Sequence, residues 1–238
     1  MLFVPLKESI MDYLSNISIT AIARVKSDFP TKFGIPRQSG LCKNLLSQIV
    51  FNPPYCDENA FRGIEQFSHL WVIWGFSENI TQAFQPTVRP PKLGGNERRG
   101  VFATRSPFRP NPLGLSCVKL EKVIRTDEGI TLEVSGGDMK DGTPVFDIKP
   151  YIPYADCVEN ASGGFAQQHS TDRLTVEIPS ALLERVPENK RAALTEVLSL
   201  DPRPAYQNDE TRTYGFEFAG FEVKFRVEQT TLTVVSIE

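Results

Sequence analysis

The chain has 238 residues, of which 40% are hydrophobic and 23% are charged, and its formal net charge is −3. This composition excludes a disordered chain and predicts one substantial core with a small second module. The acidic balance argues against a protein that binds nucleic acid over its whole surface. The apolar run at the N-terminus is too short for a signal peptide and no later run approaches membrane-spanning length, so we expect a cytoplasmic protein.

The first two thirds of the chain predict β structure. Strands separated by Pro/Gly-rich loops are expected over residues 17–25, 69–76, 114–124, 130–134 and 145–148. Helical periodicity is scarce there, apart from a short turn near residues 58–67. Many strands with few crossover helices favour an antiparallel barrel or sandwich. No glycine pair completes the GxGxxG fingerprint of a dinucleotide-binding fold.

Residues 100–116, GVFATRSPFRPNPLGLS, combine three prolines with two arginines and an asparagine. Proline fixes φ and removes a backbone donor, which predicts a rigid loop. Arg105 and Arg109 carry planar donor forks suited to carboxylate or phosphate, and Asn111 adds a donor and an acceptor. The pattern indicates a preorganised binding site, the alternative being a surface crossover whose prolines only end strands.

Residues 138–156 place four carboxylates, two lysines and two tyrosines around an Asp141-Gly142 turn. With the preceding loop they supply both signs of charge, which suits a zwitterionic or phosphate-bearing ligand, unless these charges are only solvated. A wider segment, residues 89–125, holds nine basic and two acidic residues. Its excess of +7 is compatible with a phosphate-bearing partner or with ordinary surface. The four cysteines form no CxxC pair, so no metal site is expected.

The small polar residues of segment 159–172 predict a linker. Beyond it, Pro187 is placed to open a helix that runs to residue 200, and Asp201-Pro-Arg-Pro ends it. Alternating apolar residues then predict strands over 214–218, 221–227 and 231–237. A helix packed on a small antiparallel sheet is therefore expected, with its aromatic stripe in the core.

Six ordered motifs resemble the TrmO family of tRNA methyltransferases over nearly the whole chain: PRQSG (36–40), FSHLWV (67–72), TVRPPKLGGN (87–96), GVFATRSPFRPNPLG (100–114), DGTPVFDIKPYIPYAD (141–156) and DPRPAY (201–206). The resemblance implies a mainly β protein, with an antiparallel β-barrel domain over residues 17–160 that binds S-adenosylmethionine and a small α+β domain over 173–238. It also implies a homodimer with the cofactor near the interface. The implied activity is N6-methylation of N6-threonylcarbamoyladenosine beside the anticodon of tRNA.

The resemblance assigns cofactor contacts to three regions of the barrel domain and to Arg105 and Leu115. The regions are Pro36, Arg37 and Gln38; Ser77 and Glu78; and the loop of Ser135, Gly136, Gly137 and Asp138. Ser77 and Glu78 depart from the side chains of the family, so only a backbone contact is expected there. Gly136-Gly137 could equally form a plain turn, and Leu115 could be a core residue.

The acceptor nitrogen of this substrate is conjugated and needs a base or a polarised carbonyl. Asp138 and Asp141 are the candidate bases, and Lys149 or Arg109 could polarise the carbonyl or pair with the threonyl carboxylate. Asn111 could hydrogen-bond the purine edge. As alternatives, Asp141 only caps its turn and Lys149 only pairs with Asp147.

Arg203 and Tyr206 could contact a phosphate and a stacked base of the anticodon loop, or could only pack beside the helix. On this basis cofactor binding should need the first domain alone, and tRNA capture should need both. Two other functions remain open: a barrel methyltransferase acting on a small metabolite, and a non-catalytic RNA-binding protein.

Overall fold

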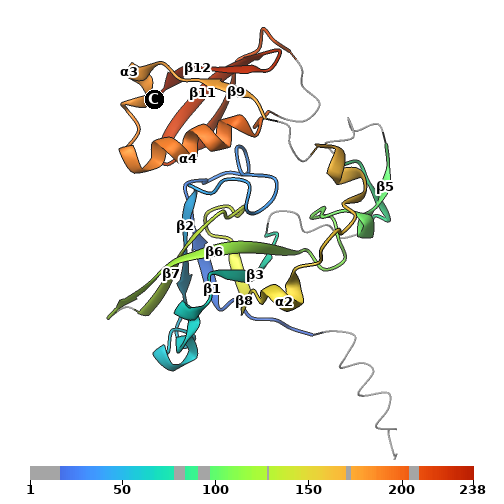
Figure 1. The fold of residues 1–238 in the computed structure, drawn as a ribbon, viewed down its shortest axis with the longest axis vertical. Helices are drawn as coiled ribbons and strands as arrows, with labels where there is room; N and C mark the ends of the chain where they lie inside the picture. The colour runs from blue at the N-terminus through green and yellow to red at the C-terminus, as the bar shows by residue number, and fades with distance from the viewer. Residues whose placement is uncertain (1–16, 78–83, 91–96, 128, 170–172, 204–208) are drawn as a thin grey trace, which may run out of the picture.

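The fold was analysed in a computed structural model that describes residues 17–77, 84–90, 97–127, 129–169, 173–203 and 209–238 (Figure 1). Its first part is a closed barrel with the strand order β1-β2-β7-β6-β3-β8. The strands are β1 (Ala23–Lys26), β2 (Leu46–Phe51), β3 (His69–Gly75), β6 (Leu113–Thr126), β7 (Gly129–Ser135) and β8 (Pro144–Pro150). All neighbouring strands pair antiparallel, which confirms the expected β-barrel.

Alternation along the strands builds the barrel core. In β7, Ile130, Leu132 and Val134 are buried while the residues between them are partly exposed. This period of two places one set of side chains inside the closed sheet. Strand β2 was not predicted from the sequence, although its burial alternates in the same way. The first strand begins at Ala23 rather than at residue 17.

The C-terminal part is a helix on a sheet, as expected. The sheet has the order β10-β11-β12-β9 and consists of β9 (Thr175–Glu177), β10 (Tyr214–Phe218), β11 (Phe221–Glu228) and β12 (Thr231–Ile237). The C-terminal part also contains the helices α3 (Ser180–Leu183) and α4 (Glu188–Ser199). Tyr214, Phe216 and Phe218 are buried, so the aromatic stripe is core. Strand β9 was not predicted, and it pairs parallel to β12.

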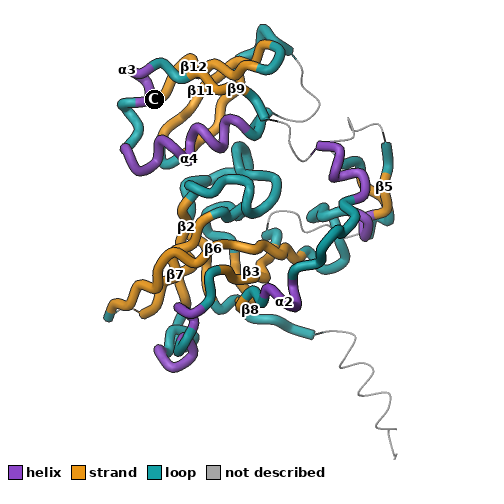
Figure 2. Tube along the Cα trace, in the orientation of Figure 1, coloured by secondary structure: helices purple, strands orange, loops and turns teal. Residues whose placement is uncertain are grey.

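Short elements lie in the connections between the strands, and of these α2 and η5 lie between the barrel and the C-terminal part (Figure 2). They are the 3₁₀ turns η1 (Glu58–Phe61), η2 (Ile64–Gln66), η4 (Val101–Ala103) and η5 (Gly164–His169), the helix α2 (Pro153–Asp156), and a two-stranded sheet of β4 (Thr87–Val88) and β5 (Arg99–Gly100). The predicted linker thus contains η5. Within the described residues, none of the helices has the length and apolarity to cross a bilayer.

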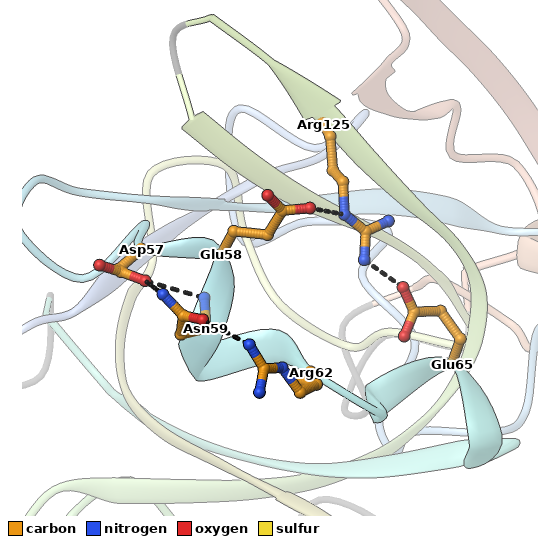
Figure 3. A network of polar contacts seen from close by, with 6 residues as sticks. All are labelled: Asp57, Glu58, Asn59, Arg62, Glu65 and Arg125. Atoms are coloured by element: carbon orange, nitrogen blue, oxygen red, sulfur yellow. Dashed lines mark hydrogen bonds and ion pairs between the residues drawn. The ribbon is translucent and has the colours of Figure 1, made fainter.

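Arg125, near the end of β6, ties the β6–β7 hairpin to η1 and η2 (Figure 3). Its Nε donates to Glu58 at 3.1 Å, and its Nη2 donates to Glu65. The guanidinium holds the pKa of Glu65 below its usual value, first through this hydrogen bond. Asp57 caps η1 by accepting from the backbone N–H of Asn59 at 2.8 Å. Arg125 is therefore engaged in the barrel, far along β6 from the proline-rich loop.

Candidate functional site

Four segments that are distant in sequence meet at one end of the barrel. Arg105 donates from Nη1 to Gln38 Oε1 at 2.5 Å, which joins the proline-rich loop to the β1–β2 connection. The backbone N–H of Gly40 donates to the Gly136 carbonyl at 2.8 Å. The N–H of Cys117, on β6, donates to Ser39 Oγ at 3.1 Å. The structure thus brings the predicted cofactor residues Gln38, Arg105 and Gly136 together, with Ser39, Gly40 and Cys117 between them.

Asp138 is held by a buried hydrogen-bond chain that starts on β3. Trp74 donates from Nε1 to Ser116 Oγ at 2.8 Å, and Ser116 donates in turn to Asp138 Oδ1 at 2.5 Å. Ser116 is fully buried and Trp74 nearly so. Because the hydroxyl receives one bond and gives the other, the carboxylate of Asp138 is fixed in one orientation.

Burial raises the pKa of Asp138 above its usual value. The Ser116 hydrogen bond, the backbone N–H groups of Asp138 and Ser39, and the charge of Arg105 act in the opposite direction. Arg105 is the one cation among these influences on the Asp138 carboxylate. A half-buried acid with a raised pKa that also feels the charge of a cation is a typical feature of a functional site.

The loop between β7 and Asp138 needs its two glycines. Gly136 has φ of +77°, which disfavours a side chain, and a Cβ there would lie 3.3 Å from Gly40 Cα. A Cβ at Gly137 would lie 3.1 Å from Ser47 Oγ. Gly136 therefore lets the loop approach residue 40 closely, while Gly137 lies against Ser47.

The proline-rich loop is braced from within. Arg109 donates from Nη1 to the Thr104 carbonyl at 2.7 Å and lies 5.8 Å from the Phe102 ring centroid. Asn111 is exposed. The N–H of Phe76 donates to the Pro112 carbonyl at 2.9 Å, so Ser77 follows a residue that touches this loop. Glu78 lies outside the described residues.

Asp141 and Lys149 both have partners within the chain. Asp141 Oδ1 accepts from the backbone N–H of Ser27 at 2.9 Å, which joins the turn before β8 to the segment that follows β1. The carboxylate lines a cleft shared with Lys190 and Glu217 of the C-terminal part. Lys149 pairs with Asp147 at 2.9 Å on the outside of β8.

Leu115 is exposed and is not a core residue. With a relative exposure of 55%, it lies on the outer face of β6 beside Leu113, at 39%. Phe108, in the preceding loop, is also exposed. An apolar surface therefore adjoins the candidate site.

The guanidinium of Arg203 is paired with a neighbouring carboxylate of the same chain. Nε and Nη2 each donate to one oxygen of Asp201 at 2.8 Å, and the side chain is only 11% exposed. A phosphate contact would have to break this bidentate pair. The Arg203 carbonyl accepts from Arg37 Nη2 at 3.3 Å, which connects this segment to a predicted cofactor residue. Tyr206 lies outside the described residues.

The basic segment at residues 89–125 does not act as one free patch. Arg99, Lys119 and Arg125 form ion pairs with Glu97, Glu121 and Glu58 respectively. Among the residues that the structure describes, no group of His, Cys, Asp and Glu side chains could hold a metal ion.

Sequence reasoning missed Ser39, Ser116 and Trp74. Ser116 lies in a strand between apolar residues, and an inward-facing serine in an apolar alternation is the signal that could have found it. Nothing local to Trp74 or Ser39 indicates their partners, because these are about 40 or more positions away in sequence.

Two family models match the chain. The tRNA-methyltransferase O N-terminal domain matches residues 24–157, and the TrmO C-terminal domain matches residues 171–238.

Among curated proteins, the tRNA (adenine(37)-N6)-methyltransferase of Escherichia coli is 40% identical over 94% of this chain and 99% of its own length. A putative S-adenosylmethionine-dependent methyltransferase, RcsF, of Pseudomonas aeruginosa is 38% identical over 90% of this chain and 94% of its own. The crystal structure of TrmO from Pseudomonas aeruginosa superposes with a TM-score of 0.76 at 32% identity, covering 94% of this chain and 97% of that one.

Proposed function

The chain belongs to the tRNA-methyltransferase O family, and on this basis we propose that it methylates N6 of the adenosine at position 37 of tRNA, with S-adenosylmethionine as methyl donor. The observation that supports this proposal at the level of residues is the Asp138 carboxylate, which Ser116 orients and whose pKa the charge of Arg105 lowers, at the end of the barrel where the four segments meet. The family assignment supports the reaction, and this geometry supports Asp138 and Arg105 as members of its site.

The residues present fit the chemical groups of S-adenosylmethionine. The cofactor carries cationic sulfonium and ammonium groups, a carboxylate and an apolar purine face, and it supplies an electrophilic methyl group when bound. Asp138 offers a negative charge, and Arg105 offers a donor fork for a carboxylate. Gly136 and Gly137 leave backbone free of side chains, and Leu115 offers exposed apolar surface.

We further propose that the acceptor is N6-threonylcarbamoyladenosine rather than plain adenosine. Its threonyl carboxylate needs a cation, and Arg109 and Lys149 remain the candidates. Lys149 is 63% exposed and its partner Asp147 is 45% exposed, so this surface pair is weak enough to be exchanged for a substrate carboxylate. Asn111 is exposed and available to the purine edge.

Asp138 is the proposed base that takes the proton from the acceptor nitrogen. Its raised pKa brings its proton affinity nearer to neutral pH, where a base is most effective. Ser116 and Trp74 keep the carboxylate in one place, and the rigid loop positions Arg105. Alignment of reactants of this kind contributes on the order of 7 to 11 kcal/mol to rate enhancement.

We also propose a homodimer in the cytoplasm, with the exposed apolar side chains of Leu113, Leu115 and Phe108 at the subunit interface. Exposed apolar groups beside a site are typical of association surfaces. Light scattering coupled to size exclusion tests this, because Leu115→Lys should shift the protein toward the monomer mass. An unchanged mass with Leu115→Lys would remove Leu115 from the interface.

Mass spectrometry of tRNA nucleosides from cells that lack the gene tests the function. We expect loss of the N6-methylated form of threonylcarbamoyladenosine and accumulation of its unmethylated form. Normal tRNA nucleosides, together with calorimetric binding of S-adenosylmethionine, would favour a small-metabolite methyltransferase. No cofactor binding at all would favour a non-catalytic RNA-binding protein.

A further inference from the structure

Residues 28–45, which connect β1 to β2 and contain the candidate cofactor residues Pro36, Arg37 and Gln38, are packed into the C-terminal core. We call them the shared segment. Phe29, Cys42 and Leu45 are buried in one cluster with residues of α4 and of the C-terminal sheet. The rings of Phe29 and Phe218 have centroids 5.4 Å apart. Figure 1 shows the loops at the upper end of β2 directly beneath α4.

Backbone geometry shows how close this packing is. Gly34 has φ of +81°, and a Cβ there would lie 2.3 Å from Phe216 Cδ2. The pKa of the Cys42 thiol is raised to about 12, first by burial and then by the nearby Glu196 carboxylate. Cys42 therefore behaves as a neutral core side chain of an interface between the two parts of the chain.

Directional contacts fix the same segment from the C-terminal side. Glu196, on α4, accepts from Asn44 twice: Oε2 from the backbone N–H at 2.9 Å and Oε1 from Nδ2 at 2.6 Å. Arg173 donates to the Leu41 carbonyl at 3.1 Å. Arg37 donates to the Arg203 carbonyl at 3.3 Å. Residues of the C-terminal part therefore contact the shared segment at Arg37 and again at Leu41 and Asn44.

The other side of the shared segment faces the candidate site. Gln38 accepts from Arg105, Ser39 accepts from the Cys117 N–H, and Gly40 donates to the Gly136 carbonyl. The segment therefore lies between the C-terminal domain and the residues proposed to hold the cofactor.

We infer that the C-terminal domain forms part of the cofactor site by holding the shared segment in its binding conformation, with Glu196 as a positioning residue. This inference rests on the proposed function. It opposes the expectation that the first domain alone suffices for cofactor binding, because removal of the C-terminal core would leave Phe29, Cys42 and Leu45 without their packing partners.

Calorimetric titration of the full chain with S-adenosylmethionine tests the inference. We expect Glu196→Ala to raise Kd by roughly five- to tenfold, a magnitude typical of coupling between sites. The Kd of Glu196→Gln should lie between those of the wild type and Glu196→Ala, because the glutamine amide oxygen can still accept one of the hydrogen bonds from Asn44. Glu188→Ala, which removes an exposed glutamate from the first turn of the same helix, is the matched control and should leave Kd unchanged.

Two further measurements separate positioning from general destabilisation. In steady-state assays, Glu196→Ala should raise KM for the cofactor while kcat at saturating cofactor and KM for tRNA stay unchanged. Asn44→Ala, which removes the other partner of the contact, should raise KM for the cofactor in the same way. The double variant Asn44→Ala/Glu196→Ala should lose no more cofactor affinity than either single variant.

An unchanged Kd for folded Glu196→Ala and Asn44→Ala would overturn the inference. So would an effect confined to KM for tRNA, which would make this surface an RNA-binding element. A wild-type protein that fails to bind the cofactor would instead contradict the proposed function, so the two failures are distinguishable.

Discussion

Arg105 carries the most direct prediction at the scale of single residues. Arg105→Ala should weaken S-adenosylmethionine binding by tenfold or more, since a charge-assisted hydrogen bond contributes about 1.5 to 3 kcal/mol. Arg105→Lys should bind the cofactor more tightly than Arg105→Ala but more weakly than the wild type, because an ammonium lacks the planar set of donors with which the guanidinium reaches Gln38. Calorimetry measures both.

The control for Arg105 is Arg226→Ala. Arg226 lies on β11, where its Nε donates to Thr213 at 3.0 Å. Its removal should leave cofactor affinity unchanged. Equal affinities for wild type and Arg105→Ala would remove Arg105 from the cofactor site.

Ser116 sets the expected pH dependence of the reaction. Its hydrogen bond favours the charged form of Asp138 and so lowers a pKa that burial raises. If Asp138 acts as the base, kcat rises with pH as this carboxyl ionises. Ser116→Ala should therefore move the acidic limb of the kcat profile to higher pH.

The matched control is Ser236→Ala, which removes a hydroxyl of the C-terminal sheet that has no hydrogen-bond partner among the described residues. This variant should leave the profile in place. A profile that is unchanged in Ser116→Ala would show that Asp138 is not the titrating base.

The raised pKa of Asp138 also has a consequence for stability. The folded protein binds this proton more tightly than the unfolded chain, so the contribution of Asp138 to stability is present below the usual aspartate pKa. It is lost as pH rises through the raised folded value. Asp138→Asn should remove this part of the pH dependence, and denaturant titrations at several pH values would detect the change.

At the scale of elements, the pairing of β3 with β6 depends on Gly114. Gly114 lies opposite Trp74, and a Cβ there would lie 2.2 Å from the indole ring. Gly114→Ala should destabilise the protein by about 1 to 3 kcal/mol through overpacking and should disturb the bond from Trp74 to Ser116. Thermal unfolding measures the loss.

Gly100→Ala, on β5, is the control for this substitution, because a Cβ at Gly100 meets nothing within 4 Å. Its melting temperature should match that of the wild type. If Gly114→Ala also melts like the wild type, the indole of Trp74 is free to move, and the fixed chain to Asp138 is wrong.

Most elements of the fold could be predicted from local pattern. Helix α4 begins after Pro187, and β10 to β12 follow the alternation of apolar residues, because these signals act between neighbours. Strand β2 was missed although its burial alternates, and the three-residue β9 is too short to show a period. Loop rigidity was predictable from proline, but the hydrogen bonds of Arg109 to its own loop were not.

At the scale of the whole molecule, the two parts of the chain are not independent. The shared segment belongs in sequence to the barrel and in packing to the C-terminal core. No pattern within residues 28–45 could indicate this, because Phe29 meets Phe218 and Asn44 meets Glu196 only after the chain has folded. Of the residues assigned to the site from the sequence, Gln38, Arg105, Gly136 and Asp138 lie close together in the structure, whereas the contacts of Ser116 and Glu196 join segments that are distant in sequence.

The central claim is that the enzyme methylates tRNA that already carries the threonylcarbamoyl group. A pocket that pairs the threonyl carboxylate leaves a cation unpaired when that group is missing, and such loss discriminates strongly between substrates. The most direct measurement is transfer of labelled methyl from S-adenosylmethionine to two samples of one tRNA, with and without the threonylcarbamoyl group on adenosine 37. We expect incorporation only into the modified tRNA. Equal incorporation into both samples would contradict the account.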